Sequence, residues 1–509
     1  MKRMMIGACV ALVTMAGAPA ASAQTIADST ELRREVTVGG VLQHARALQR
    51  VADRNAGNRS AGSPGYDASA SYVARRLRLA GYDVTVQPFE FAYYQERAPS
   101  RFARTGPTPR TYETPADFDT MQYSGSGDVT ARVQPVDLTL PPAPEPTSTS
   151  GCEAADFAGF VAGSVALLQR GTCPFGTKAA NAVTAGASAV LIFNEGQEGR
   201  RDVIVGTLAA PSSVPVLMLS FAAGEELATL AAAGEATVHV VTSTVSETRR
   251  TVNVLADTLT GRDDRAVVVG AHLDSVTEGP GINDNGSGTA GILEIAEEMA
   301  ELDVRPTNTV RFAFWGAEEL GLVGSTYYVS RLDEAARAQI GVNLNFDMLG
   351  SPNFVRFVYD GDGSASEPAG PPGSGVVEQV LTRYFVSRRL PTEPTPFSGR
   401  SDYGPFIAVG IPAGGLFSGA EGVKTEAQAT VYGGTAGQPY DACYHQVCDT
   451  SANLSSRGLG QLVDGAAHAT LTLAERETPV RPGAGARALA GIAPAAAPKL
   501  EYQGSRLAR

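Results

Sequence analysis

The sequence has little positive charge, little histidine and no long hydrophobic run in its main part. Its 53 Asp and Glu outnumber its 41 Lys and Arg, which gives a formal net charge of -12. Because binding to a phosphate backbone needs an excess of Lys and Arg, nucleic acid is excluded as a partner. After the first residues, no stretch is long and apolar enough to span a bilayer. The sequence therefore indicates a globular protein without stable membrane insertion.

Cysteine is also scarce, with five residues, and the first of them lies in a segment typical of a secretory signal. Residues 1–23 combine Lys2 and Arg3, an apolar stretch and the small-residue sequence Ala-Ser-Ala at 21–23. We therefore expect a secreted or periplasmic protein whose four remaining cysteines form disulfides. Four cysteines allow three pairings. We favour the local bridges over free buried thiols, and these are Cys152 with Cys173 and Cys443 with Cys448.

Two common signatures of enzymes are missing. The Gly-rich stretch GPGINDNGSGTAG at 279–291 lacks the Lys-Ser/Thr ending of a P-loop and the spacing of a dinucleotide fingerprint. No Gly-x-Ser-x-Gly elbow precedes a helix at the end of a predicted strand in this core. A phosphate cradle and a serine hydrolase are therefore poor interpretations.

Acidic and histidine side chains, in contrast, cluster at the ends of predicted buried strands. His272 and Asp274 follow the apolar run 267–271, Glu318 and Glu319 follow the run 309–315, and Asp347 follows the run 339–346. A Gly-rich turn carries Asp284. In open, mostly parallel α/β sheets, ligands bind at the carboxyl ends of the strands, so these side chains are expected to meet. Imidazole and carboxylate together suit zinc. A polar loop with a satisfied histidine would explain one of these clusters but not all of them.

Three other histidines lie outside these clusters. We expect solvated or capping positions on helices for His44 and His468. His239 falls in an apolar strand and is interpreted as structural.

The length of 509 residues exceeds what one core usually supports, so we expect two folded domains. Helices over 41–54 and 65–80 and a strand over 82–91 begin a first core, and the Pro-, Thr- and Ser-rich segment from 99 indicates that the chain leaves it. The strand after Arg250 is expected to return and to pair with 84–91. The predicted organisation is a catalytic domain over 24–100 and 249–475, an inserted domain over 114–248, and a disordered Pro-, Ala- and Gly-rich tail over 476–509.

The inserted segment resembles the protease-associated domain found in several exported peptidases. The resemblance is carried by the stretch 163–195, with Arg170-Gly171-Thr172-Cys173, Lys178, Asn181 and Ala185-Gly186-Ala187. It implies a domain without chemistry of its own, which either gates access to the site or stabilises the fold.

The main domain resembles the secreted co-catalytic di-zinc aminopeptidases, the leucine-type bacterial enzymes. The resemblance rests on the sequences AHLDS, GINDNGSG, WGAEELGLVGS, NFDMLGSPN, GRSDYGPF and CYHQVCD. It implies an α/β fold with a mixed, mostly parallel sheet flanked by helices. It also implies two Zn²⁺ per chain and, as substrates, the N-termini of peptides or proteins, with preference for a large apolar first residue.

The same resemblance implies a role for individual residues. The zinc ligands would be His272, Asp284, Glu319, Asp347 and His445. Asp284 would bridge the two ions, and the bond to Asn285 would be a cis peptide. Glu318 would be the general base acting with a metal-bridged hydroxide, Tyr444 would stabilise the oxyanion, and Asp274 would orient His272. The pocket for the first residue would be formed by Met348, Gly399, Arg400 and Phe417.

Three alternatives stay open on the same fold. A carboxypeptidase for acidic C-termini would need a cluster of Arg, and the sequence offers mainly Arg400. A single-zinc glutaminyl cyclase would differ in its zinc content and in its action on N-terminal Gln. A non-catalytic receptor would have lost metal ligands, and this sequence retains all five and Glu318.

Overall fold

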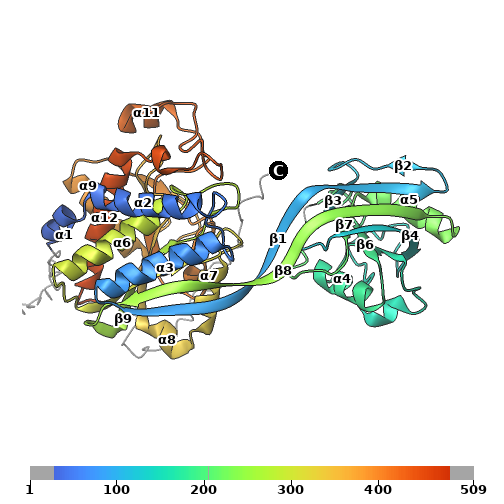
Figure 1. Ribbon diagram of the computed structural model, residues 1–509, viewed down its shortest axis with the longest axis horizontal. Helices are drawn as coiled ribbons and strands as arrows, with labels where there is room; N and C mark the ends of the chain where they lie inside the picture. Colours follow the sequence, from blue (N-terminus) through green and yellow to red (C-terminus); the bar gives the residue numbers. More distant parts are fainter. Residues whose placement is uncertain (1–27, 205, 482–509) are drawn as a thin grey trace, which may run out of the picture.

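The computed structural model describes residues 28–204 and 206–481, which form two lobes connected by a pair of long antiparallel strands (Figure 1). These strands are β1 (Asp83–Gly106) and β8 (Thr237–Asp257). They pair from Asp83 opposite Asp257 onwards, so the pairing expected for 84–91 is confirmed. The predicted signal segment 1–23 and residues 482–509 of the predicted tail lie outside the described residues. The domain bounds given above stay predictions.

The strand β1 is longer than the sequence indicated. The pattern predicted an end near Phe91, whereas β1 continues to Gly106 because it pairs with β8 along both lobes. Its second half buries Phe102 in the smaller lobe, where the ring packs against Tyr112 and Phe118. The supposed loop-rich segment after 99 also contains β2 (Arg110–Thr111), β3 (Phe118–Thr120) and β4 (Gly127–Pro135). Pairing across the sheet outweighs the weak local propensity of this segment.

The larger lobe is built on a mixed, mostly parallel sheet. Its strand order is β13-β12-β14-β11-β9-β10-β8. The strands not yet introduced are β9 (Arg262–His272), β10 (Asn308–Trp315), β11 (Ile340–Phe346), β12 (Phe357–Tyr359), β13 (Glu393–Thr395) and β14 (Ala413–Phe417). β9 runs parallel to β10 and β11, and β11 runs parallel to β14, whereas β8 and β12 pair antiparallel with β10 and β14. The predicted fold class is confirmed.

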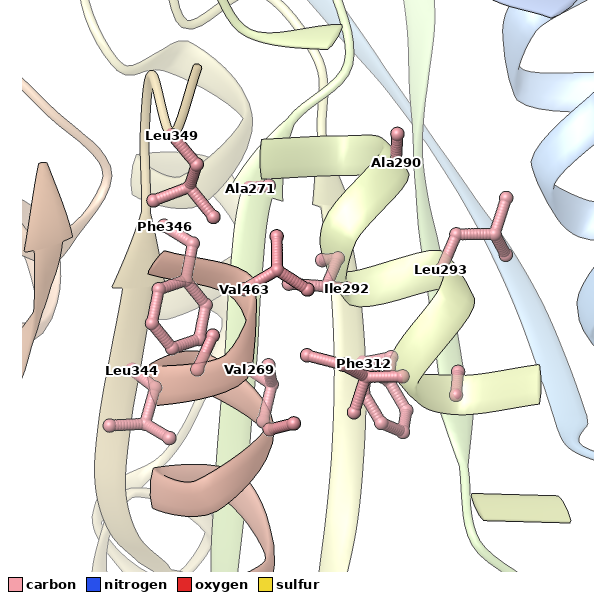
Figure 2. Close-up of a cluster of buried hydrophobic side chains, with 14 of the residues drawn as sticks. Val269, Ala271, Ala290, Ile292, Leu293, Phe312, Leu344, Phe346, Leu349 and Val463 are labelled. Atoms are coloured by element: carbon pink, nitrogen blue, oxygen red, sulfur yellow. The ribbon is translucent and has the colours of Figure 1, made fainter. Parts of the chain in front are cut away.

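Helices bury both faces of this sheet, which is why its strands read as continuous apolar runs. Successive residues of a strand point to opposite faces: Val267 and Val269 join one core and Val268 joins the other. The first core lies against α1 (Thr30–Glu35), α2 (Val38–Asp53), α3 (Pro64–Leu79), α6 (Gly286–Glu301), α9 (Ser374–Ser387) and α12 (Ser456–Ala474). Figure 2 shows Val269, Phe312 and Leu344 of three strands beneath Ile292 of α6 and Val463 of α12.

The remaining elements of the larger lobe are shorter. The second core lies against α7 (Val323–Arg331) and α10 (Tyr403–Ala408), and α8 (Glu334–Gln339) contacts β9 and β11. The last part of the chain adds α11 (Glu426–Tyr432) and the short 3₁₀ helix η2 (Ser451–Asn453).

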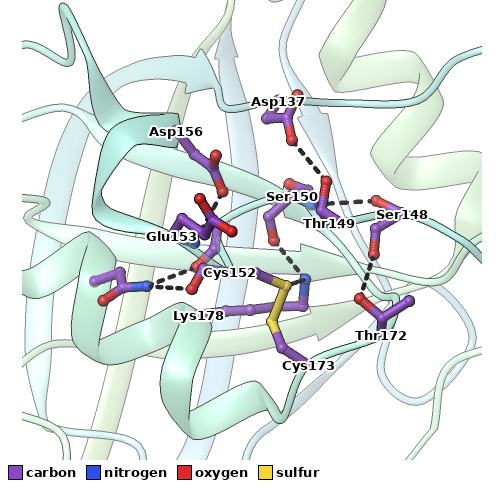
Figure 3. The surroundings of a disulfide bond; sticks show 12 residues. Asp137, Ser148, Thr149, Ser150, Cys152, Glu153, Asp156, Thr172, Cys173 and Lys178 are labelled. Atoms are coloured by element: carbon purple, nitrogen blue, oxygen red, sulfur yellow. Dashed lines mark hydrogen bonds between the residues drawn. A yellow bond between two sulfur atoms is a disulfide. The ribbon is translucent and has the colours of Figure 1, made fainter.

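The smaller lobe contains its own parallel strands and its own cores. The strands β5 (Val165–Gln169), β6 (Ala189–Phe193) and β7 (Val216–Leu219) are fully buried, and they lie with η1 (Ala154–Phe157), α4 (Phe175–Thr184) and α5 (Phe221–Ala232). The predicted Cys152–Cys173 disulfide is present here (Figure 3). Beside it, the buried ammonium of Lys178 donates to the carbonyl of Ser150.

Two of the isolated histidines are buried rather than solvated. His44 Nδ1 lies 2.7 Å from the hydroxyl of Tyr72, and His468 Nδ1 lies 2.7 Å from the hydroxyl of Ser29. The expectation of solvated or capping positions is wrong because both imidazoles face the core between helices, where a hydroxyl partner satisfies them. Among the described helices, none has both the length and the apolar character needed to cross a membrane.

Candidate metal centre

Three neighbouring strands of the larger lobe bring histidine and acidic side chains to one edge of the sheet. His272 is the last residue of β9 and is paired with Trp315, the last residue of β10. Asp347 directly follows β11, on the other side of β9. Since the three strands are parallel, their carboxyl ends lie together, and the residues that follow them share one crevice.

Asp284 reaches the same crevice from the turn before α6. The peptide bond between Asp284 and Asn285 is cis, as the resemblance implies. The side chain of Asn285 caps α6, accepts the N–H of Met348 at 3.1 Å and donates to the carbonyl of Phe346 at 2.9 Å. Asn285 therefore attaches the turn that bears Asp284 to the end of β11, which Asp347 directly follows.

The five predicted ligands form two groups that share Asp284. His272 Nε2 lies 3.2 Å from Asp284 Oδ1 and 3.3 Å from Asp347 Oδ1. His445 Nε2 lies 3.1 Å from Asp284 Oδ2 and 3.0 Å from Glu319 Oε2. In each group, the three candidate ligand atoms lie within 4.8 Å of one another. The two oxygens of Asp284 thus face different histidines, which suits a carboxylate shared by two cations.

The chemistry of this donor set fits zinc. Glu319 Oε1 and Asp347 Oδ1 are buried without a hydrogen-bond partner, although buried polar atoms are usually paired. Burial raises the pKa of Glu319 to about 7 and raises that of Glu318 well above its usual value. Buried carboxylates at such short range need cations to stay ionised. Imidazole nitrogens and carboxylate oxygens in groups of three are the ligands that zinc takes in catalytic sites.

Glu318 lies beside these groups, and Asp274 holds the turn that carries it. Glu318 Oε2 is 3.9 Å from His272 Nε2. Asp274 accepts the N–H of Glu318 at 3.1 Å and that of Glu319 at 3.4 Å. It lies 3.6 Å from His272 Nδ1, which is too long for a hydrogen bond. Orientation of His272 by Asp274 stays a prediction, whereas the contacts observed fix the backbone of both glutamates, which the sequence did not indicate.

The predicted Cys443–Cys448 disulfide closes a small ring that presents Tyr444 and His445. The two rings are stacked with their centroids 3.9 Å apart. The hydroxyl of Tyr444 accepts a hydrogen bond from Arg400 Nη2 at 3.1 Å. Arg400 is in turn paired with Glu421, with Nη1 2.6 Å from Oε1.

A cavity of about 90 Å³ opens beside the two groups. Three of the four residues predicted for a substrate pocket line it, namely Met348, Arg400 and Phe417. The fourth, Gly399, is not in its lining, and its N–H donates to the hydroxyl of Tyr403 at 2.9 Å. The lining also includes Asp284, Glu318, Glu319, Asp347, Tyr359, Thr395, Pro396, Ser398, Ser401, Tyr403, Ala420 and Tyr444. The lining therefore combines four carboxylates with apolar and aromatic side chains such as Met348, Tyr359 and Phe417.

Sequence reasoning missed two polar residues that hold this geometry. Ser401 donates to Asp347 Oδ2 at 2.6 Å. Asp449 accepts the N–H of Asn283 at 2.8 Å and that of Asp284 at 3.0 Å. Ser401 belongs to the motif GRSDYGPF and Asp449 to the motif CYHQVCD, so their position beside predicted functional residues was a usable signal.

Comparisons with known proteins identify the chain. The model of peptidase family M28 matches residues 253–470, and the model of the PA domain matches residues 133–227. An aminopeptidase of Pseudomonas aeruginosa is 48% identical over 432 residues, which cover 84% of this chain and 79% of that protein. The chain belongs to peptidase family M28. The resemblance noted in the sequence, to an aminopeptidase family with an inserted protease-associated domain, is confirmed at the level of this family.

Other proteins similar to this M28 chain extend the comparison. A probable leucine aminopeptidase 2 of Aspergillus fumigatus is 41% identical over 404 residues, which cover 78% of this chain and 75% of that protein. Among solved structures, an aminopeptidase from Aneurinibacillus sp. strain AM-1 is 26% identical and has a TM-score of 0.59. The match covers 87% of the M28 chain and 95% of that structure.

Proposed function

We propose that this M28 peptidase is an exported di-zinc aminopeptidase that removes a large apolar residue from the N-terminus of peptides. The observation that carries the proposal is the sharing of Asp284 between two groups of candidate ligands, one with His272 and Asp347 and one with Glu319 and His445. When bound there, two zinc ions would lower the pKa of a water molecule and polarise the scissile carbonyl.

Glu318 is the group that moves protons in this proposal. It lines the cavity, is buried, and stands beside the two groups that share Asp284. A general base must reach the proton that it removes, and a carboxylate at this position faces the space where the scissile bond would lie.

Tyr444 is the donor for the negative charge that develops on the carbonyl oxygen. Its hydroxyl accepts a hydrogen bond from Arg400, which can only donate, so the phenolic hydrogen is free to point into the cavity. Burial, together with nearby Asp284 and Glu319, raises the pKa of Tyr444, so that the phenol keeps its proton. A positioned donor of this kind typically contributes about 3 kcal/mol of transition-state stabilisation.

The lining of the cavity supports a free N-terminus with an apolar side chain as the substrate. The carboxylates of Glu318 and Asp347 would attract the ammonium group, while Met348, Tyr359 and Phe417 would contact the first side chain. Since an apolar pocket discriminates by only about 1–3 kcal/mol per methylene, Leu, Met and Phe should all be accepted. Asp and Glu should be poor because the site already carries several carboxylates.

The position of Arg400 argues against a carboxypeptidase. Among the described residues that line the cavity, it is the only Lys or Arg. Its guanidinium is already engaged by Glu421 and by the hydroxyl of Tyr444. A substrate carboxylate would have to compete with Glu421 for the same donors.

Export is supported by the N-terminal segment and by the two disulfides, which persist in oxidising compartments. We therefore propose a secreted or periplasmic location. The PA domain would then stabilise the fold or gate access to the site.

The test compares a leucyl peptide with its N-acetylated form, using enzyme stripped of metal and reloaded with zinc. We expect release of free leucine only from the unmodified peptide, and maximal activity at two zinc ions per chain. Comparable hydrolysis of both peptides would exclude an aminopeptidase. Maximal activity at one zinc, with cyclisation of an N-terminal Gln peptide, would indicate the glutaminyl cyclase instead.

A further inference from the structure

Arg59 is a completely buried arginine in the turn between α2 and α3, far from the metal centre in sequence. Arginine is seldom fully buried unless its charge is matched. Its guanidinium donates to backbone carbonyls, through Nε to Pro280 at 2.9 Å, through Nη2 to Gly281 at 2.6 Å, and through Nη1 to Leu273. In addition, its backbone N–H donates to the hydroxyl of Ser275 at 2.9 Å.

These carbonyls belong to the two ends of one loop. Leu273 directly follows His272, and Gly281 precedes Asp284 by three residues. By binding both ends, Arg59 draws them together and fixes the separation of His272 from Asp284. Gly281 adopts a φ of +60°, and a Cβ there would lie 2.3 Å from the carbonyl of Asp284, so the close path of the loop requires glycine.

The N–H groups of the next residues are bound by a second residue, Asp449. The carboxylate of Asp449 accepts the N–H groups of Asn283 and Asp284, and its carbonyl accepts that of Ile282 at 3.0 Å. The loop from 273 to 284 is thus held between a buried cation on its carbonyls and a buried carboxylate on its amides. This arrangement leaves Asp284 little freedom to move away from His272.

We propose that Arg59 is a positioning residue that sets the spacing of His272 and Asp284 and thereby the zinc affinity of the centre. The inference rests on the proposed function, because it concerns the metal-loaded enzyme. Lysine cannot replace Arg59 in this role, since one ammonium group lacks the planar fork that reaches three carbonyls at once. Residues that position metal ligands typically change metal affinity by about 10- to 100-fold when they are replaced.

The experiment measures zinc affinity by competition with a chelator, in the full chain, for the wild type and for Arg59→Lys. The matched control is Arg356→Lys, because Arg356 is also buried and binds the carbonyl of Pro391 at 2.8 Å and Gln461 Oε1 at 2.7 Å. Arg356 is not part of the cavity lining. Both variants should lower the melting temperature of the metal-free protein. Only Arg59→Lys should weaken zinc binding, by about 10-fold or more, and reduce the rise in melting temperature on adding zinc.

Wild-type zinc affinity in Arg59→Lys would overturn the inference, as would an equal loss in Arg356→Lys. If Arg59→Lys does not fold, Ser275→Ala decides the matter, since it removes one bond between Arg59 and the same loop while the buried charge is kept. It should weaken zinc binding by a smaller factor, and unchanged affinity would again overturn the inference. Absence of zinc binding in the wild type would instead refute the proposed function, so the two failures are distinguishable.

Discussion

Breaking the Cys443–Cys448 bridge should impair catalysis more than stability, whereas breaking Cys152–Cys173 should do the reverse. The first bridge joins cysteines five residues apart, and Tyr444 and His445 lie inside its ring. The second spans 21 residues and lies in the smaller lobe. The two double serine variants therefore form a matched pair, each the control of the other.

The loop lengths give the expected losses of stability. A disulfide stabilises mainly by restricting the unfolded chain, and the effect grows with the logarithm of the loop length. For separations of 5 and 21 residues, the loss is about 2 kcal/mol for the short ring and about 3.3 kcal/mol for the long loop. Relaxation of the short ring, however, moves both Tyr444 and His445. A displacement of roughly 1 Å in a catalytic group costs on the order of 100-fold in rate.

The assays are urea unfolding, zinc competition and hydrolysis of a leucyl anilide. The Cys443→Ser/Cys448→Ser variant should lose about 100-fold in kcat/KM and bind zinc more weakly. The Cys152→Ser/Cys173→Ser variant should keep both quantities while its smaller lobe unfolds at lower urea. Wild-type kcat/KM and zinc affinity in the first variant would refute the claim that the ring positions the two side chains.

Two further predictions concern single residues. Glu318→Gln should keep both zinc ions while kcat falls by about 100-fold or more, whereas Glu319→Gln should lower the zinc content. Metal analysis and kinetics of both variants check this. Loss of metal in Glu318→Gln would mean that the roles of the two glutamates are exchanged. Burial lowers the pKa of His468 from its ordinary 6.5 to about 4, so the unfolded chain binds the extra proton between these values. The stabilisation from the neutral imidazole is complete above pH 6.5 and is lost as the pH falls to 4, and His468→Gln should remove this dependence, at most about 3 kcal/mol in urea unfolding. An unchanged pH profile in that variant would contradict the assignment.

The parts of the candidate site that the sequence predicted follow from one regularity. Val267, Val268 and Val269 read as a strand buried on both faces, so the polar residues after it had to lie at a carboxyl end of the sheet. The same argument applies to Asp347 after β11. The two disulfides were predictable because their cysteines are only 21 and 5 residues apart in the sequence. The length of β1 was not predictable, because its second half forms a strand only through its pairing with β8.

Several residues that hold the loop of Asp284 were not predicted in this role, and they act by binding the backbone rather than other side chains. Asn285, Asp449 and Arg59 all hold the path of the loop that carries Asp284, through peptide N–H and C=O groups. Peptide groups are the same at every position, so no pattern of residue types specifies which of them a buried side chain will reach. Arg59 is the extreme case, because its partners follow it by more than 200 residues. The residue types of the candidate ligands can therefore be predicted from the sequence, whereas their spacing depends on contacts that only the folded chain creates.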